Sequence, residues 1–471
     1  MGIRSNSNNN NDASYAFQKH FIELVKPHSE GKKFFIGTFG CQMNVRDSET
    51  LRGILSDMGY IETDSESTAD LVVYNTCCVR ENAENKVYGN LGILKNLKKS
   101  KRDLKVIVCG CMMQQDSVID NIKKKHRHVD VIFGTFNIQR LPELLYSNIQ
   151  TNSMIIDVWK EEEVIQEDLP AIRESEFKAS VNIMFGCDNF CTYCVVPYVR
   201  GRERSRKPDD ILSEVAGLAK NGVKEITLLG QNVNSYGNTF KEKVSFAELL
   251  KRINDIDNIE RIRFITSHPK DISDELIYAM RDLDKVCHQL HLPFQSGSTR
   301  ILEKMKRKYT KEDYLNIIRK IKEAMPDISL STDIIVGFPG ETEEDFNDTL
   351  DIVKEVRFAS CYTFMYSKRV GTLAYNMPDE VEESVAKRRF NTLVETINPI
   401  LFENNKSYVG KTLKVLAEGV NTQNNELISG RTEYNTIVHF KASEGVIGSI
   451  VDVLITANKT FYLMGDAISN I

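Results

Sequence analysis

Three cysteines in one short segment constrain this chain more than any other feature. Cys187, Cys191 and Cys194 have the spacing C-x3-C-x2-C and follow an apolar run, Val181 to Phe185, that predicts a strand end. Three thiolates in one loop can bind three irons of a four-iron cubane and leave the fourth open to a cofactor or substrate. A structural zinc site is the alternative, but it needs a fourth Cys or His, and the next cysteine is Cys287.

The segment resembles the cluster loop of the radical S-adenosylmethionine (SAM) enzymes. In that family the amino and carboxylate groups of SAM chelate the open iron, and reductive cleavage of SAM yields a 5′-deoxyadenosyl radical. The resemblance implies that Cys187, Cys191 and Cys194 hold a [4Fe–4S] cluster and that SAM is a cofactor.

Length and composition favour a globular protein of several domains. The 471 residues are enough for two to four domains, and no apolar run is long enough to span a bilayer. The chain shows no export signal, so its ten cysteines indicate metal ligands or buried thiols rather than disulfides, and we expect a cytoplasmic protein. The net charge is −5, so a site for a polyanion has to come from a local patch. The polar tract near the N-terminus predicts a disordered tail over residues 1–31.

Strands and helices alternate over residues 32–148, before a charged linker over 149–177. This alternation predicts an α/β domain with a parallel sheet. The expected strands are Lys33 to Gly40, Ala69 to Asn75, Leu104 to Val108 and Val129 to Gly134.

Cys41, Cys77 and Cys111 each follow one of these strands. The carboxyl ends of parallel strands share one edge of the sheet, so the three thiols should meet there as a second metal site. Cys78 and Cys109 are more simply interpreted as buried core thiols.

A second run of alternating strands and helices covers residues 178–405 and predicts a (β/α)6 partial barrel, in which chemistry takes place at the carboxyl ends of the strands. Gln231 and Gln295 lie at such ends, where a ligand contact and a turn role are both open. His268, before Pro269, is expected to cap a loop. The six expected strands are Val181–Phe185, Glu225–Leu229, Ile262–Thr266, Val286–Leu292, Ile328–Val336 and Ala359–Tyr366.

Basic residues follow the cysteine loop directly. Arg200, Arg202, Arg204 and Arg206 could contact phosphates near the metal site, although a solvated turn is the alternative. By contrast, the charged run Arg300 to Lys308 predicts only a solvated helix face.

Short β-type runs separated by Asn/Gly turns fill residues 406–471 and predict a small closed β-barrel. The runs are Thr412–Ala417, Glu426–Ser429, Thr436–Phe440, Gly448–Ile455 and Phe461–Gly465. This region resembles the TRAM domain, which implies RNA binding.

Three segments of the first domain resemble the N-terminal domain of the methylthiotransferases: Thr38 to Asn44, Asn75 to Glu81 and Gly110 to Gln114. In that family Cys41, Cys77 and Cys111 would hold an auxiliary [4Fe–4S] cluster that carries the sulfur to be inserted. The same resemblance implies that the segments with Gln231 and Gln295 line a SAM pocket.

The order of the three domains resembles a tRNA methylthiotransferase. Within it, Thr38 to Asn44 together with Cys191 to Glu203 is most similar to bacterial members that act on isopentenylated adenosine. The resemblance implies addition of a methylthio group to C2 of N6-dimethylallyladenosine at tRNA position 37, with SAM used both as methyl donor and as radical source. Expected partners are the tRNA anticodon stem-loop, an electron donor such as flavodoxin or ferredoxin, and an iron–sulfur delivery protein; we expect a monomer. The rivals are methylthiolation of threonylcarbamoyl-adenosine in tRNA or of an aspartate in a ribosomal protein, and a non-catalytic iron–sulfur scaffold or electron carrier.

Overall fold

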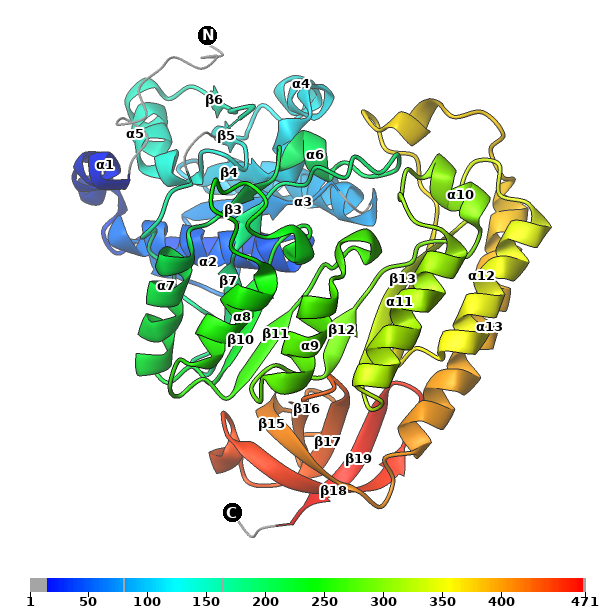
Figure 1. Ribbon diagram of the computed structural model, residues 1–471. Helices are drawn as coiled ribbons and strands as arrows, with labels where there is room; N and C mark the ends of the chain where they lie inside the picture. Colours follow the sequence, from blue (N-terminus) through cyan, green and yellow to red (C-terminus); the bar gives the residue numbers. More distant parts are fainter. Residues whose placement is uncertain (1–14, 79–80, 162–164, 469–471) are drawn as a thin grey trace. The chain divides into compact units, whose positions relative to one another are not determined.

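The computed structural model describes residues 15–78, 81–161 and 165–468 (Figure 1). The chain divides into two units, which differ from the three predicted domains. The first contains residues 1–174 together with 185–188 and 194–206, and the second contains the rest. Residues 1–14 of the predicted disordered tail lie outside the described residues.

The first unit contains a six-stranded sheet in which all neighbouring strands are parallel, as predicted. Strand β3, one of its two central strands, is buried along its whole length, as its apolar run Leu71 to Tyr74 predicts. In spatial order the strands are β2 (Ile61–Glu62), β1 (Lys33–Thr38), β3 (Leu71–Thr76), β4 (Lys105–Gly110), β5 (Val131–Phe133) and β6 (Ile155–Asp157).

Helices cover both faces of this sheet, with a separate apolar core on each face. One face packs against α1 (Tyr15–Ser29), α2 (Gln42–Asp57) and α5 (Leu141–Thr151). The other packs against α3 (Glu81–Ser100) and α4 (Asp116–Lys125).

Two sequence predictions for this unit were wrong. Residues 15–29 are not a disordered tail, because α1 buries Ile22 and Val25 in the core. The region predicted as a linker contributes strand β6, and a later part of it packs against α2, where the backbone N–H of Ile172 donates to the carbonyl of Glu49 at 3.0 Å.

The second unit contains six parallel strands arranged as two three-stranded sheets. One is β7 (Lys178–Asn182), β10 (Glu225–Leu229) and β11 (Arg261–Phe264); the other is β12 (Gln289–His291), β13 (Ser329–Val336) and β14 (Ser360–Met365). A bridge between Ile262 and Val286 joins the two sheets. The predicted partial barrel is therefore confirmed.

Helices cover one side of these strands (Figure 1). They include α7 (Pro208–Lys220), α8 (Phe246–Asn254), α9 (Asp274–Asp282), α11 (Lys311–Ala324) and α12 (Glu343–Val356), while α13 (Glu383–Lys406) leads to the C-terminal region. The carboxyl ends of the strands remain available for loops that can carry a site.

The last strands form a closed β-barrel, as predicted. Parallel pairing of β17 with β19 closes the ring, and Val415, Phe440 and Leu463 are fully buried inside it. Around the barrel the strands are β15 (Thr412–Val420), β16 (Ile428–Thr432), β17 (Ile437–Lys441), β19 (Tyr462–Ala467) and β18 (Ile450–Asn458).

Two buried arginines of β11 explain why this barrel belongs to the second unit. Arg261 donates to the carbonyls of Lys414 and Arg431, each at 2.9 Å. Arg263 donates to the carbonyls of Thr432 and Glu433, at 2.7 and 2.8 Å. The barrel backbone is thus fixed to the strands by charge-assisted hydrogen bonds.

Within the described chain, no helix combines the length and the apolar character needed to cross a bilayer.

Candidate metal centres

Cys41, Cys77 and Cys111 lie where the predicted sheet edge places them. Cys41 directly precedes α2, Cys77 directly follows β3, and Cys111 opens a short 3-10 turn after β4. Gly40 has a φ of 119°, and a Cβ at that position would lie 2.7 Å from Sγ of Cys77. A glycine is therefore needed for the close approach of the Cys41 and Cys77 loops.

Asn44, in the first turn of α2, connects this group of cysteines. Its Oδ1 accepts from Sγ of Cys41 at 3.8 Å and from Sγ of Cys111 at 3.9 Å. Its Nδ2 donates to the carbonyls of Phe39 and Thr76, at 2.8 and 2.9 Å. The asparagine thus fixes two thiols and the two strand ends beside them, a role that the sequence analysis missed.

Arg200 reaches the same group of cysteines and is only 5% exposed. Its Nε donates to Sγ of Cys111 at 3.1 Å, and its Nη2 donates to Oδ1 of Asn44 at 2.9 Å and to Oδ2 of Asp47 at 2.6 Å. A hydrogen bond from Cys78, together with the Arg200 charge, lowers the pKa of the Cys111 thiol despite its burial. Cys111 is therefore suited to the thiolate form that binds iron.

Cys78 and Cys109 are buried, as expected for core thiols. Cys109 packs in the apolar core on one face of the sheet, and burial raises its pKa. Cys78 differs because it also hydrogen-bonds Cys111; this contact and burial raise its pKa. The neutral Cys78 thiol is thus a donor to the neighbouring Cys111.

The cysteine loop at 187–194 is held by backbone contacts. The N–H of Cys187 donates to the carbonyl of Gly201 at 3.2 Å. Gly186 has a φ of 76°, and a Cβ there would lie 2.0 Å from the carbonyl oxygen of Arg202, so this turn requires glycine. Further along, the N–H of Thr192 donates to the carbonyl of Met305 at 3.1 Å, and its hydroxyl donates to the carbonyl of Lys304 at 3.0 Å.

Arg307 lies beside Cys191, with Nη1 3.5 Å from its Sγ. Its Nη2 donates to the carbonyl of Pro293 at 2.9 Å and its Nε to the hydroxyl of Tyr309 at 3.0 Å. The side chain is 5% exposed, so the prediction of a solvated helix face was wrong for this residue. The guanidinium thus places a fixed positive charge beside this sulfur.

The two groups of cysteines fit iron–sulfur clusters by the chemistry of their donors. Among the described residues, no three Cys, His, Asp or Glu side chains converge on a point that one metal ion could occupy. A four-iron cubane does not require such convergence, because each cysteine binds a different iron.

The four arginines of the basic run after the cysteine loop do not form one exposed surface. Arg200 and Arg206 are buried, and Arg206 pairs with Glu167, so the prediction that these two contact phosphates was wrong. Arg202 is exposed and pairs with Asp188 at 2.8 Å. Arg204 lies over the ring of Phe136, 5.4 Å from its centroid. A phosphate contact stays a prediction for Arg202 and Arg204.

Gln231 and Gln295 follow β10 and β12, at the carboxyl end of the partial barrel. Gln295 has a φ of 68°, and its backbone hydrogen-bonds Asp333 and Ile335 of β13 at 3.0 and 2.9 Å. Such a conformation in a non-glycine residue is costly and is often found at ligand sites. Their contact with SAM stays a prediction. Nδ1 of His268 accepts from the N–H of Lys270, which confirms that His268 caps a loop.

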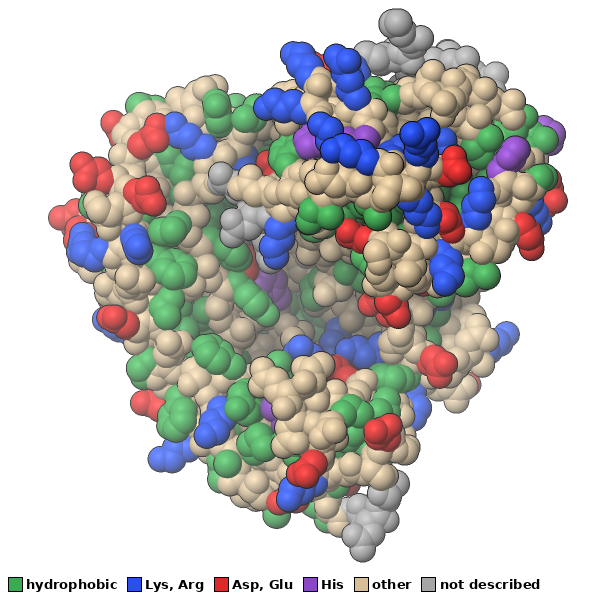
Figure 2. Space-filling model, turned by 180° about the vertical axis from the view of Figure 1, so that it is seen from behind, with side chains coloured by type: hydrophobic (Ala, Val, Ile, Leu, Met, Phe, Trp, Pro, Cys, Tyr) green, Lys and Arg blue, Asp and Glu red, His purple; other side chains and the backbone are tan. Residues whose placement is uncertain are grey.

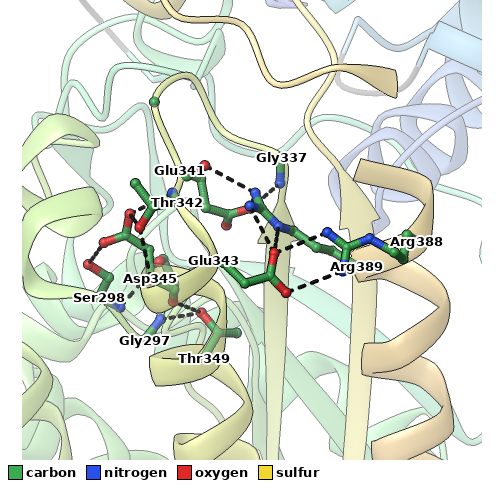
Figure 3. Close-up of polar contacts among 12 residues, drawn as sticks. Gly297, Ser298, Gly337, Glu341, Thr342, Glu343, Asp345, Thr349, Arg388 and Arg389 are labelled. Carbon is green, nitrogen blue, oxygen red and sulfur yellow. Dashed lines mark hydrogen bonds and ion pairs between the residues drawn. The ribbon is translucent and has the colours of Figure 1, made fainter. Parts of the chain in front are cut away.

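The loop after β13 is braced by a buried ion pair (Figure 3). Oε2 of Glu341 accepts from the N–H of Gly337 and from Nη1 of Arg389, both at 2.8 Å. Asp345 then forms a capping box with Thr342 at the start of α12 and accepts from Ser298 at 2.5 Å. These contacts hold the Gly337–Gly340 turn in a fixed conformation.

Polar and aromatic side chains line a pocket of about 450 Å³ on the C-terminal barrel. Nδ1 of His439 lies 3.0 Å from Nδ2 of Asn421 and 2.9 Å from Oγ of Ser429, and the His439 ring lies 4.8 Å from that of Tyr462.

Basic side chains also occur at the end of a helix in the first unit, where Lys123, Lys124 and Lys125 occupy the last turn of α4. Figure 2 shows Lys and Arg side chains gathered at the top of the face in view.

Comparison with known families assigns the three regions separately. Residues 33–134 match the model of the uncharacterized protein family UPF0004, residues 181–353 that of the Radical SAM superfamily, and residues 406–468 that of the TRAM domain. The Radical SAM match implies SAM and a [4Fe–4S] cluster.

Solved structures support the same fold. The radical SAM methyltransferase TsrM from Kitasatospora setae has a TM-score of 0.54 at 15% identity, over 73% of this chain and 74% of that one. The cobalamin-dependent SAM radical enzyme OxsB has a TM-score of 0.51 at 13% identity, over 80% of this chain and 57% of that one. At these identities the likeness concerns the fold alone.

Curated relatives match over almost the whole length. The tRNA-2-methylthio-N(6)-dimethylallyladenosine synthase of Acetivibrio thermocellus is 57% identical over 461 residues, 96% of each chain. The protein of the same name from Alkaliphilus oremlandii is 56% identical over 453 residues, also 96% of each chain. The chain therefore belongs to the radical SAM family of tRNA methylthiotransferases whose curated members carry the name tRNA-2-methylthio-N(6)-dimethylallyladenosine synthase.

Proposed function

We propose that this enzyme adds a methylthio group to C2 of N6-dimethylallyladenosine at position 37 of tRNA. The observation that carries this proposal is the presence of two separate cysteine triads in a chain 57% identical, over 96% of its length, to a synthase of that name. When bound, SAM supplies the methyl group from one molecule and a 5′-deoxyadenosyl radical from another, and the auxiliary [4Fe–4S] cluster supplies the sulfur.

The residues of this chain divide into two sets in the proposal. Cys187, Cys191 and Cys194 hold the cluster that binds SAM, and Arg307 provides a fixed positive charge beside Cys191. The auxiliary cluster is held by Cys41, Cys77 and Cys111, and Asn44 braces the strand ends beside Cys41 and Cys77 through its Nδ2, which donates to the carbonyls of Phe39 and Thr76. Gln231 and Gln295 contribute to the SAM pocket.

The tRNA anticodon stem-loop is the proposed macromolecular substrate. The adenine base at position 37 has to leave the base stack of the stem-loop to reach the reacting groups. Arg202 and Arg204 are proposed to contact phosphates, and the His439–Tyr462 pocket of the barrel offers an aromatic face and hydrogen-bonding groups of the kind that bind unstacked bases. An electron donor of the flavodoxin or ferredoxin class and an iron–sulfur delivery protein complete the proposal.

The substrate is tested by mass spectrometry of tRNA nucleosides from a deletion strain. We expect loss of 2-methylthio-N6-dimethylallyladenosine and its return on complementation with the wild-type gene. Loss of a methylthiolated threonylcarbamoyl-adenosine instead, with the dimethylallyl nucleoside unchanged, would contradict the proposal and favour the related tRNA substrate.

The roles of the two triads are tested by product analysis under anaerobic reduction. Replacement of Cys187, Cys191 and Cys194 by Ala should abolish 5′-deoxyadenosine. Replacement of Cys41, Cys77 and Cys111 by Ala should leave 5′-deoxyadenosine but no methylthiolated nucleoside. If this second variant still makes the product, the auxiliary cluster is not the source of sulfur.

A further inference from the structure

Arg200 is a buried cation whose partners converge on the Cys41–Cys77–Cys111 site. A guanidinium stays charged at any physiological pH, so its burial requires compensation. The partners are the carboxylate of Asp47, the amide oxygen of Asn44 and the thiol of Cys111. Cys111 is one of the three cysteines of this site, and Asn44 contacts two of them, Cys41 and Cys111.

The segment that carries Arg200 is seated on the same site. Helix α6 (Val196–Val199) lies between Cys194, a ligand of the proposed radical SAM cluster, and Arg200. Val195 and Val199 pack together with Cys78 and Cys111 in one buried apolar group. The position of Arg200 is therefore fixed by packing and not only by its ion pair.

We propose that Arg200 is a positioning residue that holds Cys111 and Asn44 around the auxiliary cluster and raises the reduction potential of that cluster. Hydrogen bonds to the sulfurs and the local net charge set the potential of an iron–sulfur cluster, because added electrons are stabilised by nearby donors and positive charge. Asp47 acts in the opposite direction through its negative charge. The inference rests on the auxiliary cluster of the proposed function.

The test uses the full-length chain in which Cys187, Cys191 and Cys194 are replaced by Ala, so that only the auxiliary site can hold a cluster. Arg200→Gln, Asp47→Asn and Arg206→Gln are added to it singly. Asp47→Asn keeps an oxygen that can accept from Nη2 of Arg200, and Arg206 is a matched control because it is a buried, carboxylate-paired arginine of the same segment. Iron content and a dithionite redox titration followed by electron paramagnetic resonance are measured on each protein.

We expect about four irons in each protein, as one cubane requires. The midpoint potential should become more negative with Arg200→Gln and more positive with Asp47→Asn, and stay unchanged with Arg206→Gln. A purely structural role would not move the potential in opposite directions. Equal potentials for the parent and Arg200→Gln, or shifts of the same sign for Arg200→Gln and Asp47→Asn, would overturn the inference.

The same measurements distinguish failure of the proposed auxiliary cluster from failure of the inference about Arg200. If the parent protein with intact Arg200 binds no iron, the auxiliary cluster of the proposed function is contradicted. If Arg200→Gln alone fails to hold iron, the comparison of Asp47→Asn with the parent decides: a positive shift supports the electrostatic role, and no shift overturns it.

Discussion

Arg263 and Glu225 form a buried ion pair, with Nε of the arginine 3.0 Å from Oε2 of the glutamate. Both residues are at most 5% exposed, and they belong to neighbouring strands, β11 and β10. The same arginine donates to Thr432 and Glu433 of the C-terminal barrel. One side chain therefore neutralises a buried carboxylate and holds the backbone of the barrel.

Replacement of Arg263 by Met should destabilise the second unit by about 3–5 kcal/mol, because it removes the nearest charge partner of the buried Glu225 carboxylate together with the hydrogen bonds to Thr432 and Glu433. Lys178 at 3.6 Å and Arg261 at 3.8 Å remain near the carboxylate and compensate it only in part. The measurement is the urea midpoint of that unit's unfolding transition. Arg252→Met is the control, since Arg252 pairs with Glu248 at the surface. Its replacement should lower the free energy of unfolding by at most about 1 kcal/mol. Similar losses for the two variants would show that the buried pair contributes no more than a surface pair.

Reconstituted wild-type protein should contain about eight irons and eight sulfides if both cubanes form. Each triple Cys→Ala variant should lose about four of each. Cys109→Ala should leave the count unchanged because Cys109 packs in the core, and Cys78→Ala should too because Cys78 hydrogen-bonds Cys111 and lies outside the proposed ligand triad. Anaerobic iron and sulfide analysis makes the measurement, and a wild-type count near four would contradict the second cluster.

The positions of the cysteines could be predicted because they depend on local sequence. Alternating strands and helices determine which edge of the sheet each strand end occupies, so Cys41, Cys77 and Cys111 could be grouped without a structure. Helix α1 also had a local signal, since Gln18, Ile22 and Val25 have helical spacing and are buried, but the adjoining polar tract obscured it.

The environment of the arginines could not be predicted in this way. Arg200 and its partner Asp47 are separated by 153 positions in the sequence, and Arg263 and its partner Thr432 by 169. A run of basic residues looks the same in sequence whether its members are solvated or buried, because the compensating groups come from distant parts of the chain.

The pH dependence of stability should reveal the capping box at α12. Burial opposes ionisation of Asp345, but hydrogen bonds from Arg300, Ser298 and Thr342 outweigh it and lower its pKa to about 2. This is below the value of about 3.9 for an unfolded chain, so the stabilisation is complete above about pH 4 and is lost as the pH falls toward 2.

Asp345→Asn should therefore cost about 2 kcal/mol at neutral pH, in the range of hydrogen bonds to charged groups, and the difference from wild type should shrink between pH 4 and 2. Urea midpoints measured across this range provide the check. Asp313→Asn is the matched control, because Asp313 forms the same box with Thr310 at an exposed position on α11 and should cost only about 0.5–1 kcal/mol. A difference for Asp345→Asn that stays constant with pH would show that its charge is not involved.

The remaining arginines of the basic run test how the enzyme holds tRNA. Arg202 is 73% exposed at its side chain and pairs with Asp188 outside the core, so a phosphate can exchange for that carboxylate at little cost. Arg204 is also outside the core, with its guanidinium over Phe136.

If Arg202 and Arg204 each contact one phosphate, Arg202→Gln and Arg204→Gln should each reduce the slope of log affinity against log salt by about one. Arg206→Gln should leave the slope unchanged, because that side chain is buried against Glu167. Filter binding of tRNA over a salt series gives the slopes, and wild-type slopes for both Arg202→Gln and Arg204→Gln would reduce this stretch to a solvated turn.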